Sequence, residues 1–138
     1  MKGSVRLVDE SISDNVKRFI GGYIDSVELL EILLLLRGSP GREWDPVSVS
    51  RELRSNPNSV TMRLNHLCTR GLLLMKESPS PLYFYKPKTE ELDLVVKELA
   101  EAYRMRPTRV IEFIFSKQAD MLRDFSDAFK FRKDDKNG

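Results

Sequence analysis

Apolar residues recur at helical spacing in the middle of the chain, where they predict two short amphipathic helices. The first helix places Val49 and Leu53 four positions apart on one face. The second has an apolar stripe at spacings of four and three, formed by Val60, Leu64 and Leu67. Such spacing brings the apolar side chains to one side of each helix, which can then pack against a core.

Capping residues and prolines set the limits of these two helices. Asp45 is a favourable N-cap and Pro46 a favourable first residue, because the first N–H groups of a helix have no intrahelical partner. Asn56 and Pro57 repeat this pair and start the second helix. Gly71 is expected to close that helix in the left-handed conformation.

A β-hairpin is predicted after the second helix. Its strands are Leu72 to Glu77 and Leu82 to Lys86, joined by a Ser-Pro-Ser-Pro turn. Proline lacks the N–H that a strand needs for pairing, so both prolines belong to the turn.

Residues 45–88 therefore resemble a winged helix-turn-helix. The match is closest to the MarR-like and ArsR-like bacterial regulators, whose recognition helix ends in a leucine, three variable residues and Gly-Leu, as in Leu67 to Leu72. The resemblance implies sequence-specific binding of double-stranded DNA, with the recognition helix 58–70 in the major groove. It also implies a brief strand around Glu43 to Asp45 that pairs with the hairpin, or wing. Winged helices serve as protein-binding modules too, and an interaction module without DNA binding is the alternative.

The N-terminal region predicts two further helices. A short one is expected from Ile12 to Ile20, ended by Gly21 and Gly22. Asp25, with Glu28 three positions later, has the form of a capping box and predicts the start of the next helix. That helix, Ser26 to Arg37, is apolar nearly all round, so it must be covered on several sides by other helices or by a second subunit.

The C-terminal region predicts helices interrupted by a proline. Thr89 is the expected cap of the first of them. Proline inside a helix costs about 3 kcal/mol, so either the helix bends at Arg104 to Arg106 or a new one starts at Pro107. Apolar positions at helical spacing continue to Phe129, and 132–138 reads as a charged, disordered tail.

The distribution of aromatic residues favours a homodimer. Six of the 12 aromatic residues lie between Tyr103 and Phe131, outside the winged helix. A surplus of apolar surface there points to dimerisation through terminal helices, as the resemblance also implies, and a packed monomer is the alternative. The predicted fold is mainly α with a small β-wing: a winged helix-turn-helix with additional N- and C-terminal helices for dimerisation. The predicted order is an N-terminal extension (1–25), the winged helix-turn-helix domain (26–88), C-terminal dimerisation helices (89–131) and the tail (132–138).

Length and composition restrict the class of protein. A chain of 138 residues is large enough for one domain with its own core. A single cysteine, no apolar segment after the first residues and an apolar run of only Leu29 to Leu36 predict a cytoplasmic protein without a membrane span. The net charge is +2, but 45–88 holds seven basic and three acidic side chains, the sign expected of a phosphate-facing surface.

Candidate DNA contacts follow from the helical geometry of 58–70. Asparagine can bond to adenine, threonine can touch a thymine methyl group and methionine offers apolar contact, whereas arginine and lysine are candidates for phosphates. The wing tip carries no lysine or arginine, and Met62 stands where many MarR-like helices carry arginine. The predicted DNA-binding residues are Asn58, Ser59, Thr61, Met62, Arg63, Asn65, Thr69, Arg51, Arg54, Arg70, Lys76 and Lys86.

Catalysis and metal binding find no support in the sequence. His66 and Cys68 are the only residues of their types and lie about 200° apart on a helix, so they cannot share a metal. Cys68 is expected to be a small half-buried thiol, with a redox sensor as the alternative. The sequence therefore predicts a transcriptional regulator that is not an enzyme and has no cofactor, and it identifies no effector or target DNA sequence.

Overall fold

A computed structural model of the chain describes residues 12–77 and 79–117. Its helices and strands are α2 (Asp14–Tyr23), α3 (Val27–Arg37), α4 (Pro46–Leu53), α5 (Pro57–Thr69), β1 (Leu73–Lys76), β2 (Leu82–Tyr85) and α6 (Glu90–Met105), followed by a helical segment at 107–117. The predicted tail and the apolar positions around Phe129 lie outside the described residues.

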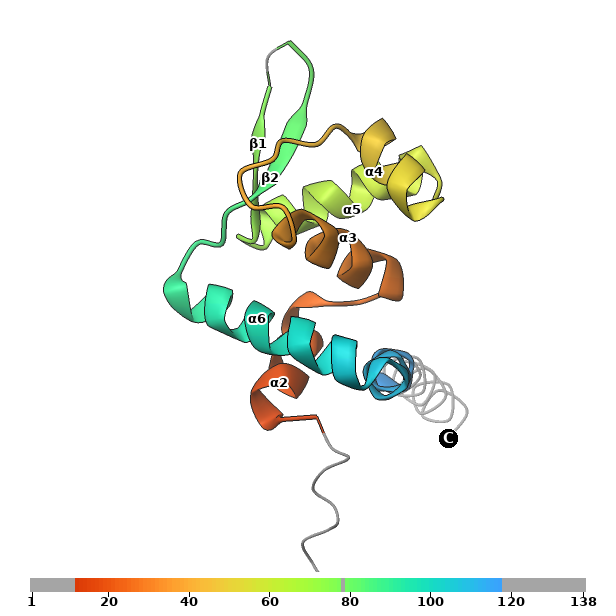
Figure 1. The fold of residues 1–138 in the computed structure, drawn as a ribbon, viewed down its shortest axis with the longest axis vertical. Coiled ribbons are helices and arrows are strands. Elements are labelled where there is room, and N and C mark those ends of the chain that lie inside the picture. The colour runs from red at the N-terminus through yellow and green to blue at the C-terminus, as the bar shows by residue number, and fades with distance from the viewer. Residues whose placement is uncertain (1–11, 78, 118–138) are drawn as a thin grey trace, which may run out of the picture.

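A winged helix-turn-helix forms one half of the molecule (Figure 1). Helices α3, α4 and α5 pack together, and the antiparallel hairpin β1–β2 extends from the end of α5. A single bridge pairs Trp44 with Tyr83, with N···O distances of 2.8 and 2.7 Å, and adds a third short strand to the hairpin. The predicted mainly α fold with a β-wing is confirmed, and so is the brief strand before α4.

The predicted caps hold the ends of these helices. Asp45 Oδ1 accepts from the Ser48 amide at 2.9 Å, and Asn56 Oδ1 accepts from the Asn58 amide at 2.7 Å. Pro46 and Pro57 open the helices as expected, where an N–H has no intrahelical partner. Gly71 follows α5 with φ +80°, a conformation that costs glycine little. Thr89 Oγ1 caps α6 in the same way.

Helix α3 is the centre of the core. Five of its residues are buried: Leu29, Leu30, Ile32, Leu33 and Leu36. They meet α4, α5 and β2 on one side, and α6 crosses on the other, where the Tyr103 hydroxyl donates to Glu31 Oε2 at 3.1 Å. The expectation that this nearly all-apolar helix is covered on several sides is confirmed within one chain.

Two predicted boundaries in the N-terminal region are wrong. The first helix does not end at Gly21 and Gly22 but continues to Tyr23, whose ring stacks on Phe19 with centroids 4.6 Å apart. This contact between residues four positions apart on one helix offsets the low helix propensity of the two exposed glycines.

The predicted capping box of Asp25 and Glu28 at the start of α3 is also wrong. Ser26, not Asp25, is the N-cap and accepts from the Leu29 amide at 3.1 Å. Asp25 and Glu28 turn towards α5 instead, where cationic side chains attract them.

The proline at 107 separates two helices. Helix α6 ends at Met105, and Arg106 has φ −138° and ψ 62°, outside the helical region. A new helical segment then begins at Pro107, where a missing N–H has no cost, so the second of the two alternatives holds. None of the helices within the described ranges combines the length and apolar character needed to cross a lipid bilayer.

Candidate nucleic-acid interface

The turn between α4 and α5 fixes the direction of the predicted recognition helix. Arg54 closes α4 in the left-handed region, with φ 56° and ψ 49°. The Ser55 amide then donates to the Ser50 carbonyl at 2.9 Å, and Asn56 caps α5. Ser50, which accepts this bond, is buried; among the described residues no other polar or charged residue is. A tight turn of this kind leaves the direction of α5 little freedom.

Helix α5 has a buried face and an outward face, as its sequence pattern predicts. Val60, Leu64 and Leu67 are completely buried. Four of the predicted contact residues are exposed on the outward side: Asn58, Met62, Asn65 and Thr69. The exposed fraction of Met62 is 46%. The outward face therefore offers amides, a hydroxyl and one apolar side chain to a partner.

The wing contacts helix α5 through Tyr83. Its hydroxyl donates to Oδ1 of Asn65 at 2.7 Å, although its ring is buried in the core. Burial raises the pKa of Tyr83, and the neighbouring Cys68 adds a smaller effect, so the hydroxyl keeps its proton and stays a donor at neutral pH. Asn65 is thus both exposed and oriented by a neighbouring element.

Two arginines of the predicted set point towards the N-terminal half of the chain. Arg63 Nε lies 3.1 Å from Glu28 Oε1, and Arg63 NH1 lies 3.6 Å from Asp25 Oδ1. Arg70 NH2 lies 3.2 Å from Asp25 Oδ2, while Arg70 NH1 donates to the Tyr23 carbonyl at 2.7 Å. Both guanidinium groups are engaged inside the molecule and are only partly exposed.

The other predicted DNA-binding residues differ in whether they form hydrogen bonds or ion pairs within the protein. Ser59 Oγ donates to Glu28, and Thr61 Oγ1 donates to the Pro57 carbonyl one turn earlier at 2.9 Å. Lys76 on β1 pairs with Glu43 at 2.9 Å. By contrast, three of the predicted phosphate contacts are exposed and form no ion pair with another described residue: Arg51, Arg54 and Lys86.

Cys68 and His66 show no arrangement for catalysis or metal binding. The Cys68 thiol is half-buried, and burial raises its pKa, so the reactive thiolate is disfavoured at neutral pH. Within the described part of the chain, no three acidic, histidine or cysteine side chains gather as metal ligands would. The Nδ1 atom of His66 is buried and has no hydrogen-bond partner there.

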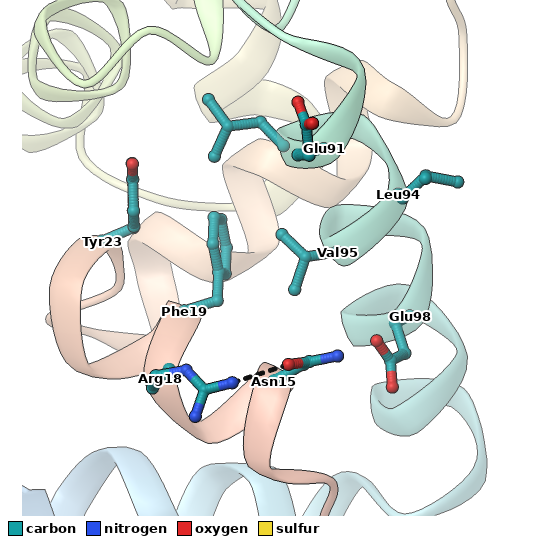
Figure 2. A pocket seen from close by; sticks show the side chains of 9 residues that line it. Asn15, Arg18, Phe19, Tyr23, Glu91, Leu94, Val95 and Glu98 are labelled. Atoms are coloured by element: carbon teal, nitrogen blue, oxygen red, sulfur yellow. Dashed lines mark hydrogen bonds between the residues drawn. The ribbon is translucent and has the colours of Figure 1, made fainter.

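A groove lies between α2 and α6, outside the helix-turn-helix (Figure 2). Its volume is about 620 Å³. Aromatic and aliphatic side chains line it, with polar groups at the rim; the lining residues are Asn15, Arg18, Phe19, Tyr23, Glu91, Leu92, Leu94, Val95 and Glu98. Figure 2 shows Phe19 and Val95 facing each other across it, and Asn15 bonded to Arg18. The sequence pattern did not indicate this groove, because its walls come from helices about 70 positions apart.

The sequence analysis also missed the residues that hold α5 from behind. In the sequence, Asp25 and Glu28 have the spacing of capping residues, and Tyr83 belongs to a predicted strand. One signal was available for Glu28: the polar residues Ser59 and Arg63 are four positions apart, which puts a polar line along one side of α5. A polar line beside a core stripe predicts a polar or charged partner.

Comparisons with known proteins give a limited result. No protein-family model matches this chain, and no curated protein matches it. Among solved structures, the chain is similar to transcriptional regulator Tm0710 from Thermotoga maritima, at 14% sequence identity and a TM-score of 0.49, over 86% of this chain and 85% of that chain. A likeness of this degree identifies neither a family nor a function, so the functional argument depends on the geometry of the site.

Proposed function

We propose that this protein binds double-stranded DNA in a sequence-specific way and acts as a dimeric transcriptional regulator of the bacterial type. The observation that carries the proposal is the outward face of α5. It presents amide and hydroxyl groups, and basic side chains are exposed in the neighbouring segments, at Arg54 before α5 and at Lys86 after β2. Base edges in the major groove present donors and acceptors to such groups, and phosphates on both sides attract the cations.

Each part of the surface has its own role in this proposal. Helix α5 enters the major groove, where Asn58, Asn65 and Thr69 meet base edges and Met62 makes apolar contact. Arg51, Arg54 and Lys86 contact phosphates, because their side chains are exposed and form no ion pair with another described residue. Lys76 can join them if the phosphate competes with Glu43. Ser59, Thr61, Arg63 and Arg70 support the interface from the sides of α5.

Dimerisation through the N- and C-terminal helices completes the proposal. Apolar side chains on α6 and the segment after it are exposed in the single chain: Leu94 (63%), Met105 (55%) and Phe115 (60%). Exposed apolar surface of this kind, beside the groove between α2 and α6, is typical of an interface. Two copies would place their recognition helices about 34 Å apart, one turn of DNA.

DNA titration tests this function directly. Fluorescence anisotropy with pooled random duplexes at about 50 mM salt should show binding, and the logarithm of affinity should fall with log salt at a slope of roughly −5 to −7 for six to eight neutralised phosphates. The absence of binding at tens of micromolar protein would overturn the proposal.

One observation favours a second candidate, a protein-interaction module. Leu74 and Phe84 are cross-strand partners on one face of the wing, and Leu74 is 49% exposed. Apolar residues on an outer wing face are unusual for contact with the phosphate backbone and suit a protein partner. This candidate predicts no DNA binding at tens of micromolar protein, whereas the proposed regulator requires binding that Arg54→Gly weakens.

A further inference from the structure

One carboxylate holds the helix-turn-helix together from behind. Glu28, in the first turn of α3, accepts from the hydroxyls of Ser55 and Ser59 and from Nε of Arg63. The distances are 2.9 and 3.0 Å for Ser59 and 3.1 Å for Arg63. These donors lie in the turn before α5, in the first turn of α5 and one turn later. A single side chain thus contacts α5 along its N-terminal half.

Asp25 extends this contact towards the C-terminal end of α5. It lies 3.6 Å from Arg63 and 3.2 Å from Arg70, and Arg70 also donates to the Tyr23 carbonyl. Two acidic and two basic side chains therefore form a neutral line between residues 23–28 and α5. In this line Arg63 is shared between both carboxylates.

The geometry of this line restrains α5 in two ways. Hydrogen bonds between charged groups are strong and directional, so Glu28 opposes sliding of α5 along its axis. Since Ser59 and Arg63 lie on one side of the helix, the same bonds oppose rotation about that axis. The apolar stripe of α5 alone would allow small rotations, because packing of aliphatic side chains has little directional preference.

The side chains of this line are sheltered rather than exposed. The exposed fractions of the Arg63 and Glu28 side chains are 23% and 22%. An Arg63 that contacts a phosphate would have to leave Glu28 partly buried without its cation, which is costly. The Arg63 side chain is thus better placed for holding the helix than for contacting DNA.

We propose that Glu28 is the positioning residue of the recognition helix and that Arg63 is its internal partner rather than a phosphate contact. The inference rests on the proposed DNA binding and adds to it: Glu28 sets the angle at which the outward face of α5 meets the groove. Loss of the carboxylate charge removes none of the DNA-contacting side chains of α5, but it changes the angle at which they meet the groove.

The test compares Glu28→Gln and Arg63→Ala with the unchanged full chain. Gln keeps the size of the side chain, but its amide group cannot accept from both serines and Arg63 at once. Glu28→Gln should weaken binding to a preferred duplex roughly tenfold. The slope of log affinity against log salt should stay the same in both variants, because neither removes a phosphate contact. Glu31→Gln is the matched control, since it removes a carboxylate of α3 that bonds to Tyr103 and not to α5.

Amide hydrogen exchange supplies a measurement that does not depend on DNA. Amide exchange in residues 55–63 should be faster in Glu28→Gln than in the unchanged chain. The exchange rates of the same amides should be unchanged in Glu31→Gln. Equal exchange and equal affinity in Glu28→Gln would overturn the inference. A salt slope that is shallower by about one per copy in Arg63→Ala would overturn the role given to Arg63. If the unchanged chain binds no DNA, the proposed function fails, while the exchange measurement still decides whether Glu28 positions α5.

Discussion

The hydroxyl of Tyr83 donates to Oδ1 of Asn65 over 2.7 Å and joins the wing to the exposed face of α5. Tyr83 is itself fixed, because its backbone pairs with Trp44 and its ring is buried. A surface asparagine usually samples several rotamers, and this bond selects one of them. The orientation of the exposed Asn65 amide is therefore determined by a residue whose ring is buried in the core.

Asn65→Ala should cost about 1–3 kcal/mol on the preferred duplex and relax the preference at one base pair. Tyr83→Phe should reproduce part of this loss, because it frees the amide without removing it. Affinities for the single and double variants, measured on the preferred duplex, form a thermodynamic cycle. Additive losses would show that the bond does not orient Asn65 for binding.

Arg54→Gly should raise the stability of the fold and lower the affinity for DNA. Arg54 has φ 56°, where glycine is not strained, so the free energy of unfolding should rise by about 0.5–1 kcal/mol. DNA affinity should fall, with a salt slope shallower by about two for a dimer, since each copy loses one phosphate contact. Lys97→Ala, which removes an exposed charge from α6, is the control and should change neither quantity.

A dimer should be visible by sedimentation at micromolar concentration, with twice the 16.0 kDa mass of the chain. Leu94→Asp and Phe115→Asp should each weaken it at least about tenfold, because a charge would be buried without a partner. Both side chains are more than half exposed in the single chain, so folding of the monomer should survive. Val47→Asp, on a residue 50% exposed at the start of α4, should leave the dimer intact. A 16 kDa species alone in the unchanged protein would remove this prediction.

Cys68→Ser should leave DNA affinity within about threefold under both reducing and oxidising conditions. Burial raises the pKa of this thiol, so little of the thiolate is present at neutral pH to react with peroxide. Anisotropy titrations before and after peroxide treatment measure the effect. A large loss of binding after peroxide in the unchanged protein, absent from Cys68→Ser, would instead favour a redox sensor.

The stabilisation by Glu28 should depend on pH in the acid range. Burial raises the pKa of Glu28, but hydrogen bonds from Ser55, Arg63 and Ser59 outweigh it and lower the pKa below the ordinary 4.5. A carboxyl group with a lowered pKa stabilises the fold above its unfolded pKa, and this contribution is lost as pH falls through the folded pKa. The groups facing Glu28 are Arg63 and the two serines, with Asp25 as the second carboxylate on Arg63.

Denaturant titrations at several pH values check this expectation. The difference in the free energy of unfolding between the unchanged chain and Glu28→Gln should be constant above about pH 6 and shrink below pH 4.5. A difference that stays constant down to the acid transition would contradict the assigned role of the carboxylate charge.

The sequence alone determined the elements whose signals are local. Asp45, Asn56 and Thr89 each bond to an amide two or three residues away, so a cap is readable from the residues beside it. The apolar stripe of α5 and the turn prolines of the wing are likewise local, and they specified the winged helix. The local signals did not decide whether a new helix begins at Pro107, because a proline is compatible both with a bent helix and with the first turn of a new one.

Only the tertiary structure decided where the charges go. The sequence gives seven basic side chains in 45–88, but Arg63 and Arg70 are paired with acidic residues at 25 and 28, and Lys76 is paired with Glu43. Asp25 and Glu28 have the spacing of a capping box, yet the attraction of two guanidinium groups draws them to α5 and leaves the cap to Ser26. A local pattern cannot show a partner more than 30 positions away. Packing brings such groups together, and so it determines which cations of the candidate interface remain available to DNA.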